Sequence, residues 1–103
     1  MDEHVVRWSE LAAEPGANGV VRRRLAGAGV GLVRVEIPAG TRAAGHEHPH
    51  EQFVEVLSGA GTLSTDAGER PFGPGAVFRF PPGTVHAAVF DEDTVLLEIN
   101  VGG

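Results

Sequence analysis

The chain has 103 residues, enough for a single domain with one hydrophobic core. Fourteen acidic and eight basic residues give a net charge of -6, so nucleic acids and anionic membrane surfaces are not expected partners. The chain contains no cysteine, lysine or tyrosine, which excludes disulfides, thiolate ligands and Schiff bases. Proton transfer is then left to His, Asp, Glu or a metal-bound water.

The chain also lacks the sequence features of a membrane or secreted protein. No apolar run approaches the roughly 18 to 20 residues that span a bilayer. The first ten residues are acidic and lack the basic-then-apolar order of a secretory signal. We therefore expect a cytoplasmic protein that has no membrane partner and acts on a small molecule.

The first half of the chain is predicted to form short strands joined by tight turns. Its glycines and prolines are spread along the chain, and one helical turn is expected between residues 8 and 13. Residues 19–25 and 30–37 are β-branched runs separated by AGAG, which predicts a hairpin. Residues 52–57 alternate apolar and polar side chains and are followed by SGAG and the short run 62–65, which predicts a second hairpin.

The second half continues this pattern. Proline and glycine breaks separate the predicted strands 76–80, 85–90 and 94–100. The whole chain therefore holds about eight or nine strands at the spacing of a sandwich or small barrel. The predicted fold class is all-β.

The stretch HEHPHEQF, residues 46–53, contains three of the five histidines. On a strand, His46 and His48 would lie on one face with their side chains about 6 to 7 Å apart. Gln52 would be a third ligand on the next strand, and His86 is the natural fourth. On spacing alone, a metal site and a polar turn remain equally open.

Two segments resemble the cupin superfamily. The sequence GTRAAGHEHPHEQFVEVLSG, residues 40–59, is similar to the first cupin motif, with Gln52 where that motif has glutamate. The sequence GAVFRFPPGTVHAAVF, residues 75–90, is similar to the second motif, with Phe90 in place of its asparagine. The resemblance implies a single cupin domain over residues 1–103, a double-stranded β-helix or jelly roll, with residues 1–5 as a flexible tail.

The resemblance also implies one divalent transition metal, Zn, Mn, Ni, Fe, Co or Cu, held by His46, His48, Gln52 and His86. The alternative is a cupin that has lost its metal. In the second motif, Gly83 is expected at a positive φ in a rigid turn that starts the strand of His86.

Glutamine in place of glutamate leaves the full +2 charge on a bound ion, which favours Lewis-acid over oxygen chemistry. The ligand pattern resembles cupins that ketonise unsaturated uronates and small polyketide-cyclase cupins. The implied function is enolisation, isomerisation or cyclisation of a small carbonyl compound. A metal-dependent dioxygenase and a non-catalytic binding module are the alternatives. The uronate family has an acid, an aromatic residue and an arginine at its last strand, whereas here Asn100 follows Glu98 and no arginine comes after it.

Glu98 and His50 are the candidate catalytic residues. Glu98 lies on the last predicted strand and is either the general base or an exposed carboxylate. His50 lies in the turn after Pro49 and is either a surface histidine or an acid–base group at the pocket mouth. Parity predicts an apolar wall, whose members would be Val54, Val56, Ala88 and Phe90.

The arginines raise a separate question. Arg34 or Arg79 could clamp a substrate carboxylate, although strand arginines that face water are the simpler interpretation. The run at residues 22–24 is interpreted as solvated or intersubunit arginines. A homodimer is expected, because so small a core would gain from one.

Overall fold

The computed structural model describes residues 4–102 and confirms the all-β class. The predicted helical turn is a short 3-10 helix, η1 (Trp8–Glu10), and a second one, η2 (Ala17–Gly19), follows. No helix in residues 4–102 is long and apolar enough to cross a membrane. Of the predicted tail at residues 1–5, residues 1–3 lie outside the described part.

The strands are β1 (Glu14–Pro15), β2 (Val21–Ala26), β3 (Val30–Ile37), β4 (Arg42–His46), β5 (Gln52–Ser58), β6 (Gly61–Thr65), β7 (Gly68–Phe72), β8 (Val77–Phe80), β9 (His86–Phe90) and β10 (Thr94–Val101).

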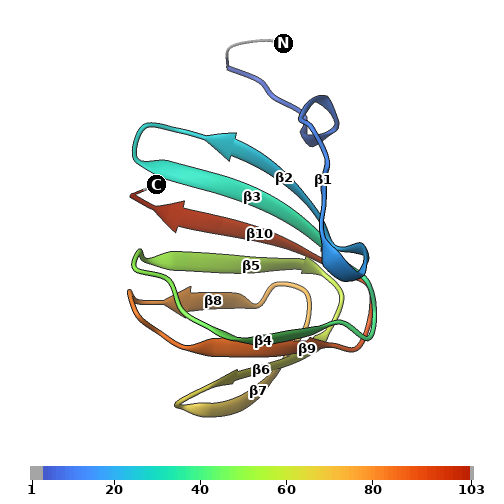
Figure 1. Ribbon diagram of the computed structural model, residues 1–103, viewed down its shortest axis with the longest axis vertical. Helices are drawn as coiled ribbons and strands as arrows, with labels where there is room; N and C mark the ends of the chain where they lie inside the picture. Colours follow the sequence, from blue (N-terminus) through green and yellow to red (C-terminus); the bar gives the residue numbers. More distant parts are fainter. Residues whose placement is uncertain (1–3, 103) are drawn as a thin grey trace.

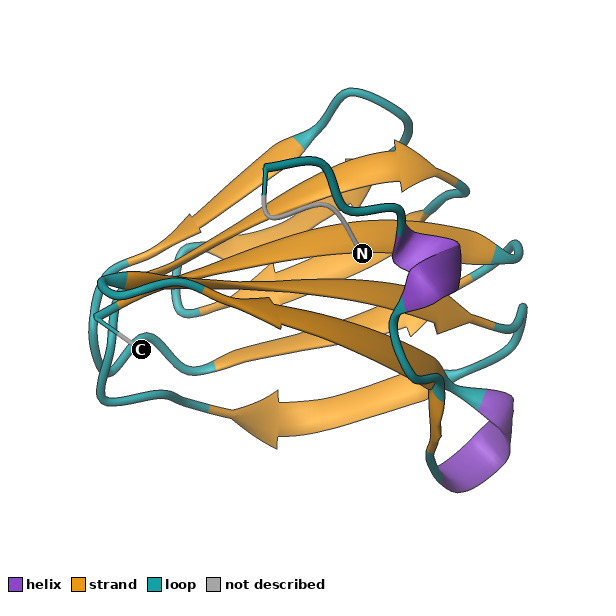
Figure 2. Cartoon of the chain, turned by 90° about the horizontal axis from the view of Figure 1, so that it is seen from above, coloured by secondary structure: helices purple, strands orange, loops and turns teal. Residues whose placement is uncertain are grey.

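The strands form two antiparallel sheets that face each other (Figures 1 and 2). The larger sheet has the order β1-β2-β3-β10-β5-β8, and the smaller has the order β4-β9-β6-β7. Strands distant in the sequence are therefore neighbours, as in a jelly roll.

The inner faces of the sheets form the core because apolar residues recur at every second position. On β10, Leu96 lies between Val35 of β3 and Val56 of β5, and all three are buried. Burial of a side chain of this size stabilises the fold by about 1.5–3 kcal/mol. Three aromatic residues are also buried in this core: Phe72, Phe80 and Phe90.

The first predicted hairpin is confirmed, and the second is wrong. Strands β2 and β3 pair directly, with Arg22 opposite Val35. Strands β5 and β6 belong to different sheets and do not pair. Both edges of β5 are already occupied by β10 and β8, so the chain crosses to the other sheet after Ser58.

Gly59 makes this crossing and has a φ of +98°, a conformation that side chains rarely adopt. A Cβ atom here would overlap Thr94 and lie 2.7 Å from the Asp93 carbonyl oxygen. The turn therefore packs directly against the start of β10.

Candidate metal centre

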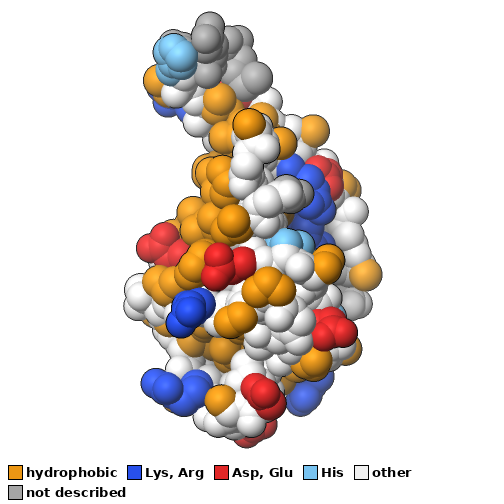
Figure 3. All heavy atoms as spheres, turned by 90° about the vertical axis from the view of Figure 1, so that its left-hand side faces the viewer, with side chains coloured by type: hydrophobic (Ala, Val, Ile, Leu, Met, Phe, Trp, Pro, Cys, Tyr) orange, Lys and Arg blue, Asp and Glu red, His pale blue; other side chains and the backbone are white. Residues whose placement is uncertain are grey.

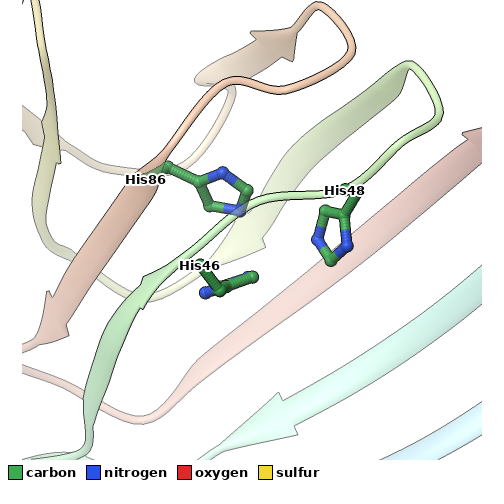
Figure 4. A group of neighbouring side chains, drawn as sticks. All are labelled: His46, His48 and His86. Atoms are coloured by element: carbon green, nitrogen blue, oxygen red, sulfur yellow. The ribbon is translucent and has the colours of Figure 1, made fainter.

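Three histidines converge at one end of the space between the sheets (Figure 4). His46 ends β4, His86 begins β9, and His48 lies in the loop after β4. One nitrogen atom from each ring lies within 4.8 Å of the others. The expectation that both histidines of the HxH pair lie on a strand is wrong for His48. Because the chain leaves the strand at this point, the ring centroids of His46 and His48 are 5.0 Å apart, closer than expected.

An irregularity in β4 turns the side chain of His46, which stays exposed, toward the cavity. Ala43 lies opposite Ala88, and His46 lies opposite His86, so three steps on β4 match two on β9. Such a bulge reverses the alternation of side chains, and bulges are common beside functional sites. Ala43 and His46 consequently face the same cavity although they are three residues apart. His46 and His86 become direct cross-strand neighbours, with ring centroids 4.2 Å apart.

The turn of the second motif holds the loop that carries His48. Gly83 has the expected positive φ, +78°. Its backbone N–H donates a hydrogen bond to the carbonyl oxygen of His48 at 2.8 Å. The turn thus fixes the backbone of one histidine while it starts the strand of another, His86.

Backbone carbonyls set the orientation of two rings. Nδ1 of His46 lies 2.9 Å from the Ala44 oxygen, and Nδ1 of His86 lies 3.0 Å from the Thr84 oxygen. A carbonyl oxygen only accepts, so each Nδ1 carries the proton and each Nε2 presents its lone pair. His86 also stacks on Phe80, with ring centroids 3.9 Å apart and planes 9° from parallel. This arrangement is typical of histidines that bind metal through Nε2.

The surroundings favour neutral imidazoles. Burial, then the neighbouring His46, His86 and His50 rings, lower the pKa of His48. Burial is also the main cause that lowers the pKa of His86, opposed by its hydrogen bond to Thr84 and assisted by His46. Neutral imidazole is the form that coordinates a cation.

Gln52 lies beside this cluster at the start of β5 and is only 4% exposed. Its Nε2 donates to Oδ1 of Asn100 at 2.9 Å, and Nε2 of His50 lies 2.9 Å from the same oxygen. Within residues 4–102 the side chain of Gln52 forms its hydrogen bond through Nε2, and no group donates to its Oε1. The amide oxygen is therefore left for a ligand.

A cavity of about 130 Å³ joins this site to the core. His46, Gln52 and His86 line it together with Glu98. The predicted apolar wall is present in Val54, Ala88 and Phe90, whereas Val56 lies deeper in the core. The space-filling view shows histidine atoms at the surface, with basic and acidic side chains beside them (Figure 3).

The two predicted catalytic residues occupy different places. Glu98 lines the cavity and is half-buried; burial raises its pKa, against the lowering effect of Arg22, Arg24, His46 and His50. His50 is outside the cavity lining, bonded to Asn100 and stacked on His48 with ring centroids 5.1 Å apart.

Arg34 and Arg79 lie on the outside of the protein, as the simpler interpretation expects, whereas Arg22 does not. Arg34 faces outward and pairs with Glu36 at 2.8 Å, and Arg79 lies in a separate surface depression. Arg22 instead lines the cavity. Sequence reasoning missed both Arg22 and Asn100, although the hairpin pairing of β2 with β3 could have indicated that Arg22 shares a face with Val35.

Comparison with known proteins identifies the family of this chain. The cupin domain family matches residues 33–101, so the chain belongs to the cupins. No curated protein matches it significantly.

Solved structures agree on the fold. An RmlC-like cupin from Shewanella frigidimarina has a TM-score of 0.89 and 22% identity, over 99% of this chain and 93% of that one. KdgF from Halomonas sp. has a TM-score of 0.85 and 26% identity, over 92% of this chain and 91% of that one. The polyketide cyclase RemF from Streptomyces resistomycificus has a TM-score of 0.82 and 23% identity, over 99% of this chain and 81% of that one.

The donor set suits a divalent transition metal. Three imidazoles with nitrogen atoms in mutual reach could hold such an ion, and two of them have their Nε2 lone pairs free. The amide oxygen of Gln52, with its NH2 group already bonded to Asn100, is a fitting neutral fourth donor.

Proposed function

We propose that the protein is a metal-dependent cupin enzyme that acts on a small carbonyl compound by enolisation, isomerisation or cyclisation. His46, His48, Gln52 and His86 would hold one divalent ion. The observation that carries the proposal is a carboxyl group, Glu98, in the same small cavity as His46, Gln52 and His86. Residues 1–103 would form one cupin domain, with its motifs at residues 40–59 and 75–90.

A bound divalent ion would supply Lewis-acid polarisation of a carbonyl oxygen, undiminished by ligand charge because Gln52 is neutral. Glu98 is the proposed general base, since a carboxyl group with a raised pKa both takes and returns a proton readily. The apolar wall of Val54, Ala88 and Phe90 would keep water from the reacting carbon.

His50 has a more peripheral proposed role. Its Nε2 faces the acceptor Oδ1 of Asn100, so Nε2 carries the proton and Nδ1 is the nitrogen free to exchange one. Acid–base work by His50 would therefore take place through Nδ1, outside the cavity lining.

KdgF and the polyketide cyclase RemF are among the proteins that share this fold, and the neutral side chain of Gln52 is what favours a non-redox enzyme. The structural neighbours also include a salicylate 1,2-dioxygenase at 17% identity, a likeness of fold. Oxygen uptake distinguishes the two chemistries: consumption of oxygen in step with turnover would favour the dioxygenase.

Elemental analysis of the purified protein tests the metal, with His86→Ala as the control. We expect about one equivalent in the wild type and a clear loss in the variant. Enolisation is tested by NMR, as metal-dependent incorporation of deuterium next to the carbonyl of small oxo compounds. Metal content no higher than that of His86→Ala would refute the proposal, as would deuterium exchange that Glu98→Gln does not slow.

A further inference from the structure

Arg22 is a cation that lines the cavity of an acidic protein. It lies on β2 directly opposite Val35, which is 1% exposed, so its side chain starts on the inner face of the sheet. Arg22 lines the same cavity as His46, Gln52, His86 and Glu98. Among residues 4–102, no other arginine lines this cavity.

The two neighbouring arginines have structural partners. Arg23 donates from Nη1 to the carbonyl oxygens of Trp8 at 3.1 Å and Leu11 at 2.7 Å, which anchors the segment around η1. Arg24 pairs with Glu14 at 2.8 Å. These contacts account for two of the three residues in the RRR run.

Arg22 has no such partner. Within the described part of the chain, no group accepts a hydrogen bond from its guanidinium, and no carboxylate lies within 4 Å of it. Arg22 and Glu98 line the same cavity as His46, and the charges of Arg22 and Arg24 both act to lower the pKa of Glu98. Arg22 is half-buried. A guanidinium with all its donors unused is suited to a planar anion, which it can bind through two parallel hydrogen bonds.

We propose that Arg22 binds a carboxylate of the substrate, which makes the substrate class a small oxo acid. This inference rests on the proposed function and narrows it. With a net charge of -6, the protein repels anions at long range, so a local cation is needed to hold one. The cavity of about 130 Å³ has room for an acid of a few carbon atoms.

Matched probes test the role of the carboxylate. Pyruvate and 2-oxobutanoate carry it, and their amides have nearly the same shape without the charge. Binding is measured by NMR titration of the wild type, Arg22→Gln, Arg22→Lys and the outward-facing control Arg34→Gln. Thermal unfolding and the NMR fingerprint of each variant verify the fold.

We expect the wild type and Arg34→Gln to bind the acids more tightly than the amides. Arg22→Gln should bind the acids about tenfold more weakly, with little change for the amides, and Arg22→Lys should be intermediate. Equal binding of acids and amides by the wild type, or no binding of the acids, would overturn the proposal. An Arg22→Gln variant that prefers acids over amides as strongly as the wild type does would also overturn the proposal.

The same titrations after treatment with EDTA, and in His86→Ala, separate this inference from the metal proposal. If the protein holds no metal but Arg22 binds carboxylates, the preference for acids over amides persists both after EDTA treatment and in His86→Ala. It then still depends on Arg22. If a metal alone attracts the acids, the preference disappears with the metal, and Arg22→Gln has no effect.

Discussion

Oδ1 of Asn100 accepts a hydrogen bond from Nε2 of Gln52 at 2.9 Å, across the paired strands β10 and β5. The same oxygen faces Nε2 of His50 at 2.9 Å. An amide group can present either its oxygen or its nitrogen to a neighbour. Because Asn100 holds the NH2 group of Gln52, the oxygen of Gln52 is the atom directed to a ligand. Asn100 is therefore a positioning residue for the proposed metal centre.

Replacement of Asn100 by leucine should weaken metal binding, because the amide of Gln52 would be free to turn its NH2 group toward the cation. The expected loss is about 10- to 100-fold in zinc affinity, measured by competition with a chelator. Asn100→Asp keeps acceptor oxygens for Gln52 and His50 and should stay close to the wild type or bind more tightly. Equal affinities of Asn100→Leu and the wild type would contradict the positioning role.

The charge of residue 52 gives a second prediction. Gln52→Glu places a formal negative charge beside the three imidazoles and should raise zinc affinity by more than about tenfold. The side chain of Asn100 would turn its own NH2 group toward the new carboxylate. In Asn100→Asp that turn is impossible and two carboxylates would face each other, so the gain from Gln52→Glu should shrink. A gain of the same size in both backgrounds would show that residues 52 and 100 are not coupled.

Glu98 predicts a pH dependence of stability. Burial raises the pKa of Glu98 in the folded protein above the usual value of about 4.3, which applies to the unfolded chain. At a pH between the unfolded and the folded pKa, the folded protein therefore binds more protons than the unfolded chain. Stability is therefore lost as the pH rises through the folded pKa. Glu98→Gln should raise the melting temperature of EDTA-treated protein at pH 7, and the difference should disappear toward pH 4.

The exposed Glu92→Gln serves as the control and should change the melting temperature little at either pH. A wild type more stable than Glu98→Gln at pH 7 would mean that Glu98 is stabilised as a carboxylate. The raised pKa, and with it the proposed general base, would then be wrong.

How much of this site is predictable from the sequence depends on the range of the contacts involved. His46, His48 and His86 lie in two short motifs, so the resemblance of these motifs to those of cupins is enough to select the three residues, although their spacing alone is not. Asn100 meets Gln52 only because β10 pairs with β5, 48 residues away along the chain. The bulge in β4 that brings His46 opposite His86 is likewise not visible in the amino-acid sequence of that strand.

The wrong prediction of a hairpin between β5 and β6 also has its cause in contacts between distant parts of the chain. A turn sequence such as SGAG shows that the chain reverses or crosses, but the choice of partner depends on which strand edges are free. Both edges of β5 are paired with strands from the later half of the chain. Arg22, in contrast, lies in a hairpin with a short turn, and its inward face follows once the register with Val35 is known.

The expected homodimer stays a prediction, for which the outer face of the large sheet offers a surface. Leu25, Leu32, Ile99 and Phe53 are opposite one another in a row across β2, β3, β10 and β5. Each is half-buried and faces away from the core. Ile99→Arg should convert a dimer to a monomer in analytical ultracentrifugation, whereas Ala67→Arg in an exposed turn should not. A monomeric wild type would refute the dimer.

Gly59 allows steric overlap to be separated from backbone strain. Gly59 and Gly68 have φ values of +98° and +111°, so alanine would be strained at either position. A new Cβ would overlap Thr94 at position 59 but would meet nothing within 4 Å at position 68. Gly59→Ala should therefore lower the free energy of unfolding by about 1–3 kcal/mol more than Gly68→Ala, measured in urea. Equal losses would mean that the start of β10 yields at no cost, and that the tight crossing between the sheets is not needed for stability.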